Sequence, residues 1–253
     1  METGLSRKIV IITGGGSGLG RAVAEAFASE GAYPFITYLS RKDPALKLSL
    51  RLADQYKVKS GAFYCDITQP DSIDKLLQNI SENYGTPDIL VNNAATWPTA
   101  FVSEMEDSDW DKTIKLNLSG YFYFSKRFIN LLLSSEKKGR VVNIVSFAGF
   151  IGSTTGHAHY AAAKGGVITF TKSLAREAAG KGITVNAVSP GMMRTPMSEE
   201  PLAKNKEAYL KRIPMGRIAE PEEVAPAVVF LSSDKAGYIT GATLDVSGGL
   251  LMH

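Results

Sequence analysis

The sequence predicts an α/β protein with a doubly wound, seven-stranded, mostly parallel sheet and helices on both faces. Three observations support this fold class. Short apolar runs alternate with amphipathic helical patterns along the whole chain, as in a parallel sheet. A glycine-rich turn follows the first apolar run. Polar residues stand directly after several later runs, at the sheet edge where such folds bind ligands.

The predicted strands are short, mostly continuous apolar runs, which is typical of strands buried on both faces. They cover residues 9–12, 35–38, 62–65, 89–91, 141–145, 183–188 and 243–246. The predicted helices cover residues 21–30, 44–56, 71–83, 109–133, 160–179 and 222–231. Gly31 ends the first helix as a C-cap glycine, and Pro221 stands in the first turn of the last. The unbroken alternation predicts a single domain over residues 1–253.

Composition excludes several classes of protein. Of the 253 residues 44% are hydrophobic and 21% charged, and 28 Lys and Arg face 25 Asp and Glu, for a net charge of +3. No block of like charge indicates binding to nucleic acid or a membrane. The single cysteine, Cys65, cannot form an internal disulfide. Without a signal peptide or a membrane-length apolar run, the sequence predicts a soluble, cytoplasmic protein.

The glycine-rich turn has the form Gly-x-x-x-Gly-x-Gly between a strand and a helix. Glycines let a backbone turn tightly and approach a pyrophosphate, and the helix N-terminus offers free N–H groups. The spacing therefore predicts a Rossmann-type dinucleotide site, with a merely flexible turn as the alternative. The predicted contacts from this turn are Gly14, Ser17, Gly18, Leu19 and Gly20.

The end of the second predicted strand carries no carboxylate. A site for a ribose 2′-hydroxyl usually has Asp or Glu there, but Tyr38 holds the position and Ser40, Arg41 and Lys42 follow. Arg41 suits a phosphate, so NADP is favoured and NAD remains possible. The alternative is a solvated basic loop. Ser17 in the glycine turn is neutral, so it adds no positive charge that would favour the phosphate of NADP.

Further cofactor contacts are predicted after the third and fourth strands. Asp66, beside Ile67, is placed to accept a hydrogen bond from an adenine amino group. Asn93, Ala94 and Ala95 combine an amide with small residues that allow close approach. Each alone is more often a turn residue than a ligand contact.

Tyr160 and Lys164 stand four residues apart in a predicted helix, so they lie on one face. A phenol titrates near ~10, and a fixed positive neighbour lowers that pKa. The pair is therefore a candidate for general acid–base catalysis near neutral pH. For an isolated match, the alternative is a tyrosine ring packed on a lysine stem.

Ser146 follows the fifth predicted strand, where its hydroxyl is able to donate to a substrate oxygen. A catalytic triad is rejected because the serine lacks a Gly-x-Ser-x-Gly sequence. His157 and His159 lack the partners of a zinc site, so no metal is predicted and both are expected in a loop near the substrate.

Asn117 is a polar residue in the otherwise apolar helix predicted over residues 109–133. One interpretation is an exposed position, because Lys115 is nearby. The other is a buried amide that holds a water or distorts the helix.

In this combination and order the motifs resemble the short-chain dehydrogenase/reductase family over essentially the whole chain. The shared elements are Thr-Gly-x-x-x-Gly-x-Gly from Thr13, Asn-Asn-Ala, the helix Asn, the Ser, Tyr-x-x-x-Lys, and Pro190-Gly191 with Thr195. Ala95 departs from the pattern, because the family usually has Gly there. The extra methyl is expected to crowd a cofactor slightly without abolishing binding.

The resemblance implies a catalytic tetrad of Asn117, Ser146, Tyr160 and Lys164. Tyr160 would be the acid or base, Ser146 would orient the carbonyl, and Asn117 would anchor a water in a proton relay. Lys164 would hold the nicotinamide ribose and lower the tyrosine pKa. The cofactor contacts expected in this half of the chain are Tyr160, Lys164, Pro190, Gly191, Met193 and Thr195.

The implied activity is hydride transfer between a nicotinamide cofactor and a carbonyl or secondary alcohol. An NADPH-dependent reductase of 3-oxoacyl-type ketones is favoured. An NAD(P)-dependent sugar or polyol dehydrogenase is the alternative, and a non-catalytic nucleotide-binding regulator is a third. Residues 213–217 and 238–241 look like both 3-oxoacyl-carrier-protein reductases and glucose dehydrogenases, so they do not decide the substrate.

The substrate is expected to contact Ser146, Tyr160 and Trp97. A lid is predicted at about residues 192–214, with Trp97 and Phe101 at the lip of the pocket. The family's carrier-binding reductases keep basic residues beside the cleft. Those positions are held here by Lys137, Lys138 and Lys181, with ordinary surface lysines as the alternative.

A homotetramer is also predicted. Gly165 and Gly166 flatten one face of the helix at 160–179, and five aromatic residues crowd positions 121–128, so part of that stripe must face outward. The resemblance implies that these two helices form one twofold interface and that the apolar tail, residues 248–253, forms a second. Two such contacts close to D₂ symmetry. A frayed C-terminus is the alternative for the tail.

Overall fold

A computed structural model describes residues 2–153 and 155–252. Its centre is a single sheet of seven strands in the order β3-β2-β1-β4-β5-β6-β7, and every neighbouring pair is parallel. The strands are β1 Ile9–Ile12, β2 Tyr33–Tyr38, β3 Gly61–Tyr64, β4 Ile89–Asn92, β5 Gly139–Ile144, β6 Ile183–Pro190 and β7 Thr243–Val246. All seven predicted strands are therefore confirmed, with ends that differ by at most two residues.

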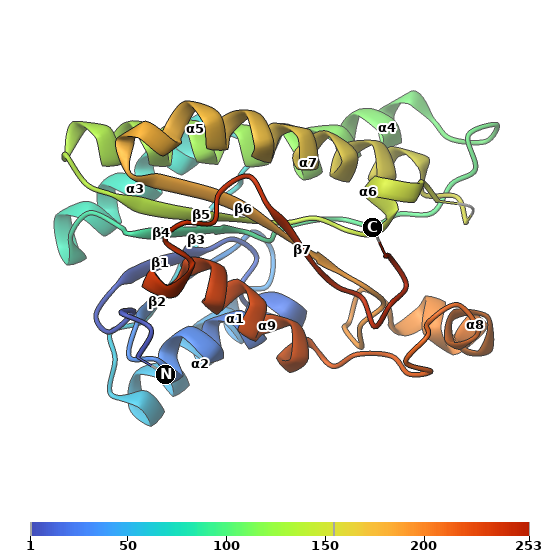
Figure 1. Cartoon of the computed structure of the whole chain (residues 1–253), viewed down its shortest axis with the longest axis horizontal. Coiled ribbons are helices and arrows are strands. Elements are labelled where there is room, and N and C mark those ends of the chain that lie inside the picture. The colour runs from blue at the N-terminus through green and yellow to red at the C-terminus, as the bar shows by residue number, and fades with distance from the viewer. Residues whose placement is uncertain (1, 154, 253) are drawn as a thin grey trace.

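Helices cover both faces of the sheet, as predicted (Figure 1). One layer contains α1 Gly18–Ser29, α2 Lys42–Tyr56 and α9 Pro221–Ser232. The opposite layer contains α3 Pro70–Tyr84, α4 Asp107–Ile114, α5 Gly120–Ser134 and α7 Ala158–Ala178. The short α6 Ala148–Ile151 and the outlying α8 Glu199–Leu210 lie toward the same end of the molecule.

Two apolar cores lie between the sheet and its helix layers. Under α1, α2 and α9 the core includes Phe27, Leu52 and Val228, all fully buried. On the other face Phe124 and Phe128 of α5 are equally buried. Because both faces of the sheet are covered, its strands read as continuous apolar runs rather than alternating ones.

Strand order reverses between β1 and β4, which are neighbours in the sheet although they are far apart in the chain. In open parallel sheets the ligand crevice lies outside the carboxyl ends of the strands at such a switch point. The fold therefore brings the segments after β1, β4, β5 and β6 to one edge, which is the edge with the predicted site residues.

The long helix predicted over residues 109–133 is interrupted. The five residues Lys115–Ser119 form a π-helix, η1, between α4 and α5. π-Helical turns are rare in proteins, and those that occur are often found at functional sites. Asn117 lies within it and is fully buried, so the prediction of a buried, helix-distorting amide is confirmed and the exposed alternative is wrong.

Gly165 and Gly166 have a role within the chain that the sequence did not suggest. A Cβ added at Gly166 would lie 2.9 Å from Leu118 of η1, and one at Gly165 would lie 3.1 Å from the carbonyl oxygen of Gly149. These glycines allow α7 to pack closely on η1 and α6. Their small size is therefore no sign by itself of a subunit interface.

Among the described residues, no helix has both the length and the apolar character that crossing a membrane requires.

Candidate active site

The glycine turn after β1 is shaped by close backbone approaches. Gly14 has a φ of +64°, a conformation that favours glycine. A Cβ at Gly20 would lie 2.5 Å from the carbonyl oxygen of Gly14, so only glycine fits there. The helix α1 begins at Gly18, and its N-cap Ser17 forms no side-chain capping bond. The first N–H groups of α1 thus face the cleft without a side-chain partner, as an anion site requires.

A cleft of about 700 Å³ extends from this turn along the sheet edge. Each predicted cofactor contact contributes to its lining. These residues are Gly14, Ser17, Gly18, Leu19, Gly20, Tyr38, Ser40, Arg41, Asp66, Ile67, Asn93, Ala94, Ala95, Tyr160, Lys164, Pro190, Gly191, Met193 and Thr195. An extended cleft that begins at a helix N-terminus fits a dinucleotide, so the residues present suit a nicotinamide cofactor.

Hydrogen bonds tie the ends of β1 and β4 together at the floor of this cleft. The Asn93 amide donates to the carbonyl oxygens of Thr13 at 2.9 Å and Gly14 at 3.3 Å. The Thr13 hydroxyl accepts from the backbone N–H groups of Asn93 at 2.8 Å and Ala94 at 3.0 Å. Asn93 therefore holds the glycine turn in shape. Thr13 is part of this hydrogen-bond network. Its place at the end of β1 puts it near the site, but motif spacing alone does not show that its hydroxyl bonds the segment after β4.

Asp66 and Arg41 lie toward the β2 and β3 end of the cleft. One carboxylate oxygen of Asp66 accepts hydrogen bonds from the N–H of Thr68 at 2.9 Å and its hydroxyl at 2.7 Å. Among the described residues its second oxygen has no hydrogen-bond donor, so it remains able to accept a bond. Arg41 directly precedes α2, is exposed, and has no ion-pair partner among the described residues. Lys42 begins α2 and does not contribute to the cleft lining.

Lys164 lies in the second turn of α7 and is almost completely buried. Its ammonium donates to the carbonyl oxygen of Ile144, at the end of β5, at 2.7 Å and to the hydroxyl of Tyr121 at 3.0 Å. It lies 5.8 Å from the centroid of the Tyr160 ring. Burial lowers the pKa of Lys164 to about 7. The Tyr121 contact was not anticipated, because that residue reads as one of several core aromatics on its helix.

The expected lowering of the tyrosine pKa is absent here. Burial raises the pKa of Tyr160 to about 12, and a hydrogen bond with Ser146 only partly opposes that rise. The physical reason is that the Lys164 ammonium faces Ile144 and Tyr121 rather than the Tyr160 hydroxyl. Desolvation therefore dominates the tyrosine in this structure.

Ser146 and Asn117 are both buried, but they contact different parts of the site. The Ser146 hydroxyl accepts from the N–H of Ala148 at 3.2 Å and faces the cleft. The Asn117 amide bonds the backbone of Thr96 in both directions, accepting from its N–H and donating to its carbonyl oxygen, each at 2.9 Å. Asn117 thus fixes the segment after β4, and it does not contribute to the lining of the cleft.

A second, smaller pocket of about 120 Å³ opens beside Ser146 and Tyr160. Trp97 lines it and stacks on His157, with ring centroids 4.4 Å apart and planes 26° apart. The His157 Nδ1 is hydrogen-bonded to the carbonyl oxygen of Pro98 at 2.8 Å. Trp97 also lies 6.4 Å from the Tyr160 ring, between centroids. The predicted substrate residues Ser146, Tyr160 and Trp97 therefore meet in one place.

Two expectations about this region are wrong. Phe101 is exposed and lines neither the cleft nor the pocket. His159 lies in α7 rather than in a loop, is fully buried, and neither of its ring nitrogens has a hydrogen-bond partner. Within the described part of the chain, no group of three or more His, Cys, Asp or Glu side chains is arranged to hold a metal ion.

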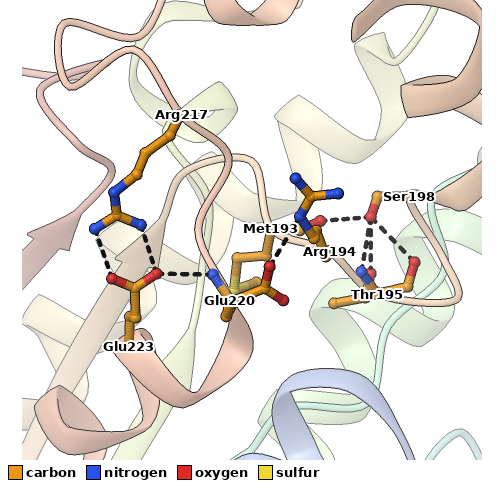
Figure 2. Close-up of polar contacts among 7 residues, drawn as sticks. All are labelled: Met193, Arg194, Thr195, Ser198, Arg217, Glu220 and Glu223. Carbon is orange, nitrogen blue, oxygen red and sulfur yellow. Dashed lines mark hydrogen bonds and ion pairs between the residues drawn. The ribbon is translucent and has the colours of Figure 1, made fainter.

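The segment 192–214 borders the small pocket and contains the helix α8. Figure 2 shows how its first stem is held: the Ser198 hydroxyl bonds the backbone of Met193 and Thr195, and Arg194 forms an ion pair with Glu220 at 2.8 Å. Farther along, Arg217 forms two hydrogen bonds with Glu223, at 2.6 and 2.7 Å (Figure 2). None of the residues of α8 itself is buried, so the segment is fixed at its ends and exposed at its middle.

Comparison with known proteins agrees with this geometry. A family model described as enoyl-(acyl carrier protein) reductase matches residues 14–251. The 3-oxoacyl-[acyl-carrier-protein] reductase FabG of Thermotoga maritima is 38% identical over 98% of this chain and 99% of its own. Proteins of the same name from Haemophilus influenzae and Escherichia coli are 40% and 39% identical over 97% of this chain and 98% of theirs. Matches of this extent mean that the chain belongs to the short-chain dehydrogenase/reductase family.

Proposed function

We propose that this oxidoreductase is an NADPH-dependent reductase of 3-oxoacyl substrates. One observation carries the proposal. Ser146 and Tyr160 line both the large cleft, which suits a dinucleotide, and the small pocket beside it. A group that faces both spaces is placed to act on the atom that passes between cofactor and substrate. The relatives named as 3-oxoacyl-[acyl-carrier-protein] reductases support the choice of substrate.

The residues suit proton delivery to a carbonyl. When bound, a reduced nicotinamide supplies the hydride that a carbonyl carbon receives. The Ser146 hydroxyl donates to the carbonyl oxygen, and Tyr160 gives that oxygen its phenolic proton, which yields a secondary alcohol. The tyrosine then regains a proton from solvent. Lys164 offers its third N–H to the cleft, where its charge stabilises the tyrosinate that forms.

NADPH is preferred to NADH in this proposal because of Arg41. The residue is exposed, lines the cleft and has no ion-pair partner among the described residues. A guanidinium matches a phosphate better than it matches a neutral ribose.

The segment 192–214 is proposed to be the substrate lid of a single domain. It supplies Met197, Tyr209 and Arg212 to the small pocket. Its exposed helix and fixed stems suit a segment that adapts to the substrate while it stays anchored. The expected cytoplasmic location remains a prediction.

A carrier-bound substrate is proposed with a correction to the docking site. Lys137 and Lys138 precede β5 and Lys181 precedes β6, so they lie at the amino ends of the strands. The cleft lies at the carboxyl ends, about 20 Å away for a six-residue strand. These lysines are therefore not beside the cleft of their own chain. Lys137 is also engaged, since it donates to the carbonyl oxygen of Thr86 at 2.8 Å. The carrier-bound substrate is therefore proposed without these three lysines as the docking site beside the cleft of the same chain.

A homotetramer is proposed on two surface features. Phe122 of α5 is 44% exposed and packs edge-on against Phe170 of α7, with ring centroids 6.1 Å apart. This gives the α5–α7 layer an outward aromatic contact that suits a partner. In the tail, Leu251 is buried in its own chain while Met252 is 76% exposed, so only part of the tail is available to a second interface. His253 lies outside the described residues.

The test is a comparison of substrates with NADPH and NADH. Oxidation of NADPH is followed with a 3-oxoacyl thioester, an enoyl thioester of the same chain length, and, in reverse with NADP, a free sugar. The proposal expects the 3-oxoacyl thioester to have the highest kcat/KM. A preference for the enoyl thioester or the sugar would reject it, and tight cofactor binding without any turnover would favour a regulator.

A further inference from the structure

A fully buried tyrosine stands behind the lysine of the active site. Tyr121, in the first turn of α5, has no exposed surface and accepts a hydrogen bond from the Lys164 ammonium at 3.0 Å. Its own hydroxyl donates to the carbonyl oxygen of Ile144 at 3.3 Å. Lys164 donates to that same carbonyl at 2.7 Å. The three groups therefore form a closed triangle behind the cleft.

The π-helix sets the position of this tyrosine. The wide turn at residues 115–119 ends immediately before α5, so it determines which side chains of α5 face α7. Asn117 within the turn is tied to Thr96, which fixes the start of α5 from the other side. The Tyr121 hydroxyl consequently lies under the lysine, and the Lys164 nitrogen lies 4.6 Å from the Tyr121 ring centroid.

The contacts of the triangle exclude a proton relay through Tyr121. Its second partner is a backbone carbonyl, which accepts a hydrogen bond but passes no proton onward. Burial also raises the pKa of Tyr121 well above its ordinary value, so the phenol stays neutral. Tyr121 therefore gives Lys164 a hydrogen-bond acceptor at a position with no exposed surface.

The hydroxyl of Tyr121 is important to Lys164 because the buried ammonium has few other partners. The titratable side chains that contact the ammonium are Tyr121 from α5 and Tyr160 from its own helix. Among the described residues no carboxylate forms an ion pair with it. A buried ammonium without a counter-ion depends on hydrogen bonds to neutral acceptors. Two of its three donors are held behind the cleft, which leaves one to point into it.

We propose that Tyr121 is a positioning residue: it holds Lys164 charged and aimed, so that one N–H of the lysine remains directed at the cofactor. The inference rests on the proposed role of Lys164 in holding the cofactor. Through its hydroxyl alone, Tyr121 sets the pH range over which the lysine performs that role.

The test uses Tyr121→Phe, which removes only the hydroxyl, and Tyr123→Phe as the matched control. Tyr123 is a half-buried tyrosine on the same helix, with its ring against Phe122 rather than against the lysine. NADPH affinity is measured from pH 5.5 to 9 by the change in cofactor fluorescence. This readout needs no substrate, so it stands even if the enzyme proves to reduce something other than a 3-oxoacyl thioester.

The proposal expects the affinity to fall at higher pH in every protein, as Lys164 loses its proton. In Tyr121→Phe that fall should occur about one pH unit lower, with an affinity loss of about tenfold near pH 7.5 that largely recovers at pH 5.5. Tyr123→Phe should follow the wild type. The same midpoint in Tyr121→Phe and wild type would overturn the proposal, and so would a loss that is equal at every pH.

A cycle with Lys164→Met separates positioning from general damage. If Tyr121 acts through the lysine, Tyr121→Phe should change NADPH affinity little in the Lys164→Met background. An equal loss in both backgrounds would mean that the hydroxyl supports the fold rather than the lysine, which contradicts the inference. Melting temperatures of all four proteins identify a variant that fails to fold. If the double variant fails, the comparison of pH midpoints between the wild type and Tyr121→Phe decides the matter.

Discussion

The glycine turn and the segment 192–214 border the same active site but are built in opposite ways. In the turn, Gly20 admits no side chain, and the Asn93 amide fixes the backbone of Thr13 and Gly14. The segment 192–214 has an exposed helix with a break in helical geometry at Asn205, where φ is −134°. Its first stem is held by an ion pair between the half-exposed side chains of Arg194 and Glu220. We call the closely packed region around the glycine turn, which is proposed to hold the cofactor, the rigid half. The proposed lid, whose helix is exposed and kinked, is the adjustable half.

The largest expected effect concerns the buried charge of Lys164. The pKa of this lysine is about 7 in the fold against an ordinary 10.5, so between those values the unfolded chain binds a proton that the folded chain does not. Lowering the pH across this window therefore destabilises the wild type, and below about pH 7 the penalty is complete. Lys164→Met lacks the penalty. When the pH is lowered from 9.5 to 6.5, the free energy of unfolding of Lys164→Met should therefore rise by several kcal/mol relative to that of the wild type.

Urea denaturation of both proteins at these two pH values measures the gain. Titration of other groups cancels in the difference, because the two chains share them. A difference that does not change with pH would show that the lysine is not the buried charge inferred here.

Gly20→Ala tests the rigid half directly. The new Cβ would lie 2.5 Å from the Gly14 carbonyl oxygen and 2.7 Å from the Asn93 amide nitrogen, so the turn must deform. NADPH affinity should fall about 10- to 100-fold. Gly16→Ala is the control in the same turn, because its Cβ would meet only Ala45 at 3.3 Å. Equal affinities in the two variants would show that the turn is softer than its contacts indicate.

The sequence predicted much of the rigid half because its determinants are local. Buried strands appear as apolar runs, and a backbone that must turn tightly needs glycines at fixed positions. A distorted helix at Asn117 was only one of two interpretations, because the apolar spacing of residues 109–133 fits a continuous helix equally well. The cause of the distortion lies in tertiary contacts: Asn117 with Thr96, and Leu118 with Gly166.

Other parts of the site depend on where side chains finally point. The tyrosine pKa was predicted to fall because spacing places Lys164 near Tyr160, but spacing does not show that the ammonium turns to Ile144. The docking lysines were placed beside the cleft, although a residue that precedes a parallel strand lies at its amino end. Strand topology alone places these lysines at the edge of the sheet opposite the cleft.

Arg41→Ala tests the edge of the rigid half. Loss of the guanidinium should lower the affinity for NADPH by about tenfold and leave the affinity for NADH nearly unchanged, because only NADPH carries the 2′-phosphate. Titration of both cofactors measures it, with Lys42→Ala as the neighbouring control outside the cleft lining. An equal loss for NADH and NADPH would remove Arg41 from the phosphate site.

The smallest effect is expected in the adjustable half. Ser198→Ala removes the hydroxyl that joins Met193 to Thr195 at the first stem of the segment. The KM for the substrate should rise about two- to fivefold while NADPH affinity stays constant. Ser153→Ala, on the other side of the small pocket, is the control. A larger loss of cofactor binding than of substrate binding would mean that the two halves are not separate.

The central claim is that Tyr160 delivers the proton between the cofactor cleft and the substrate pocket. Tyr160→Phe removes the phenolic hydroxyl and keeps the ring beside Trp97. The direct measurement is kcat for NADPH oxidation with a 3-oxoacyl thioester, alongside NADPH affinity in the same variant. The account predicts a kcat lower by about 10²- to 10⁴-fold with affinity unchanged. Turnover at the wild-type rate would contradict it.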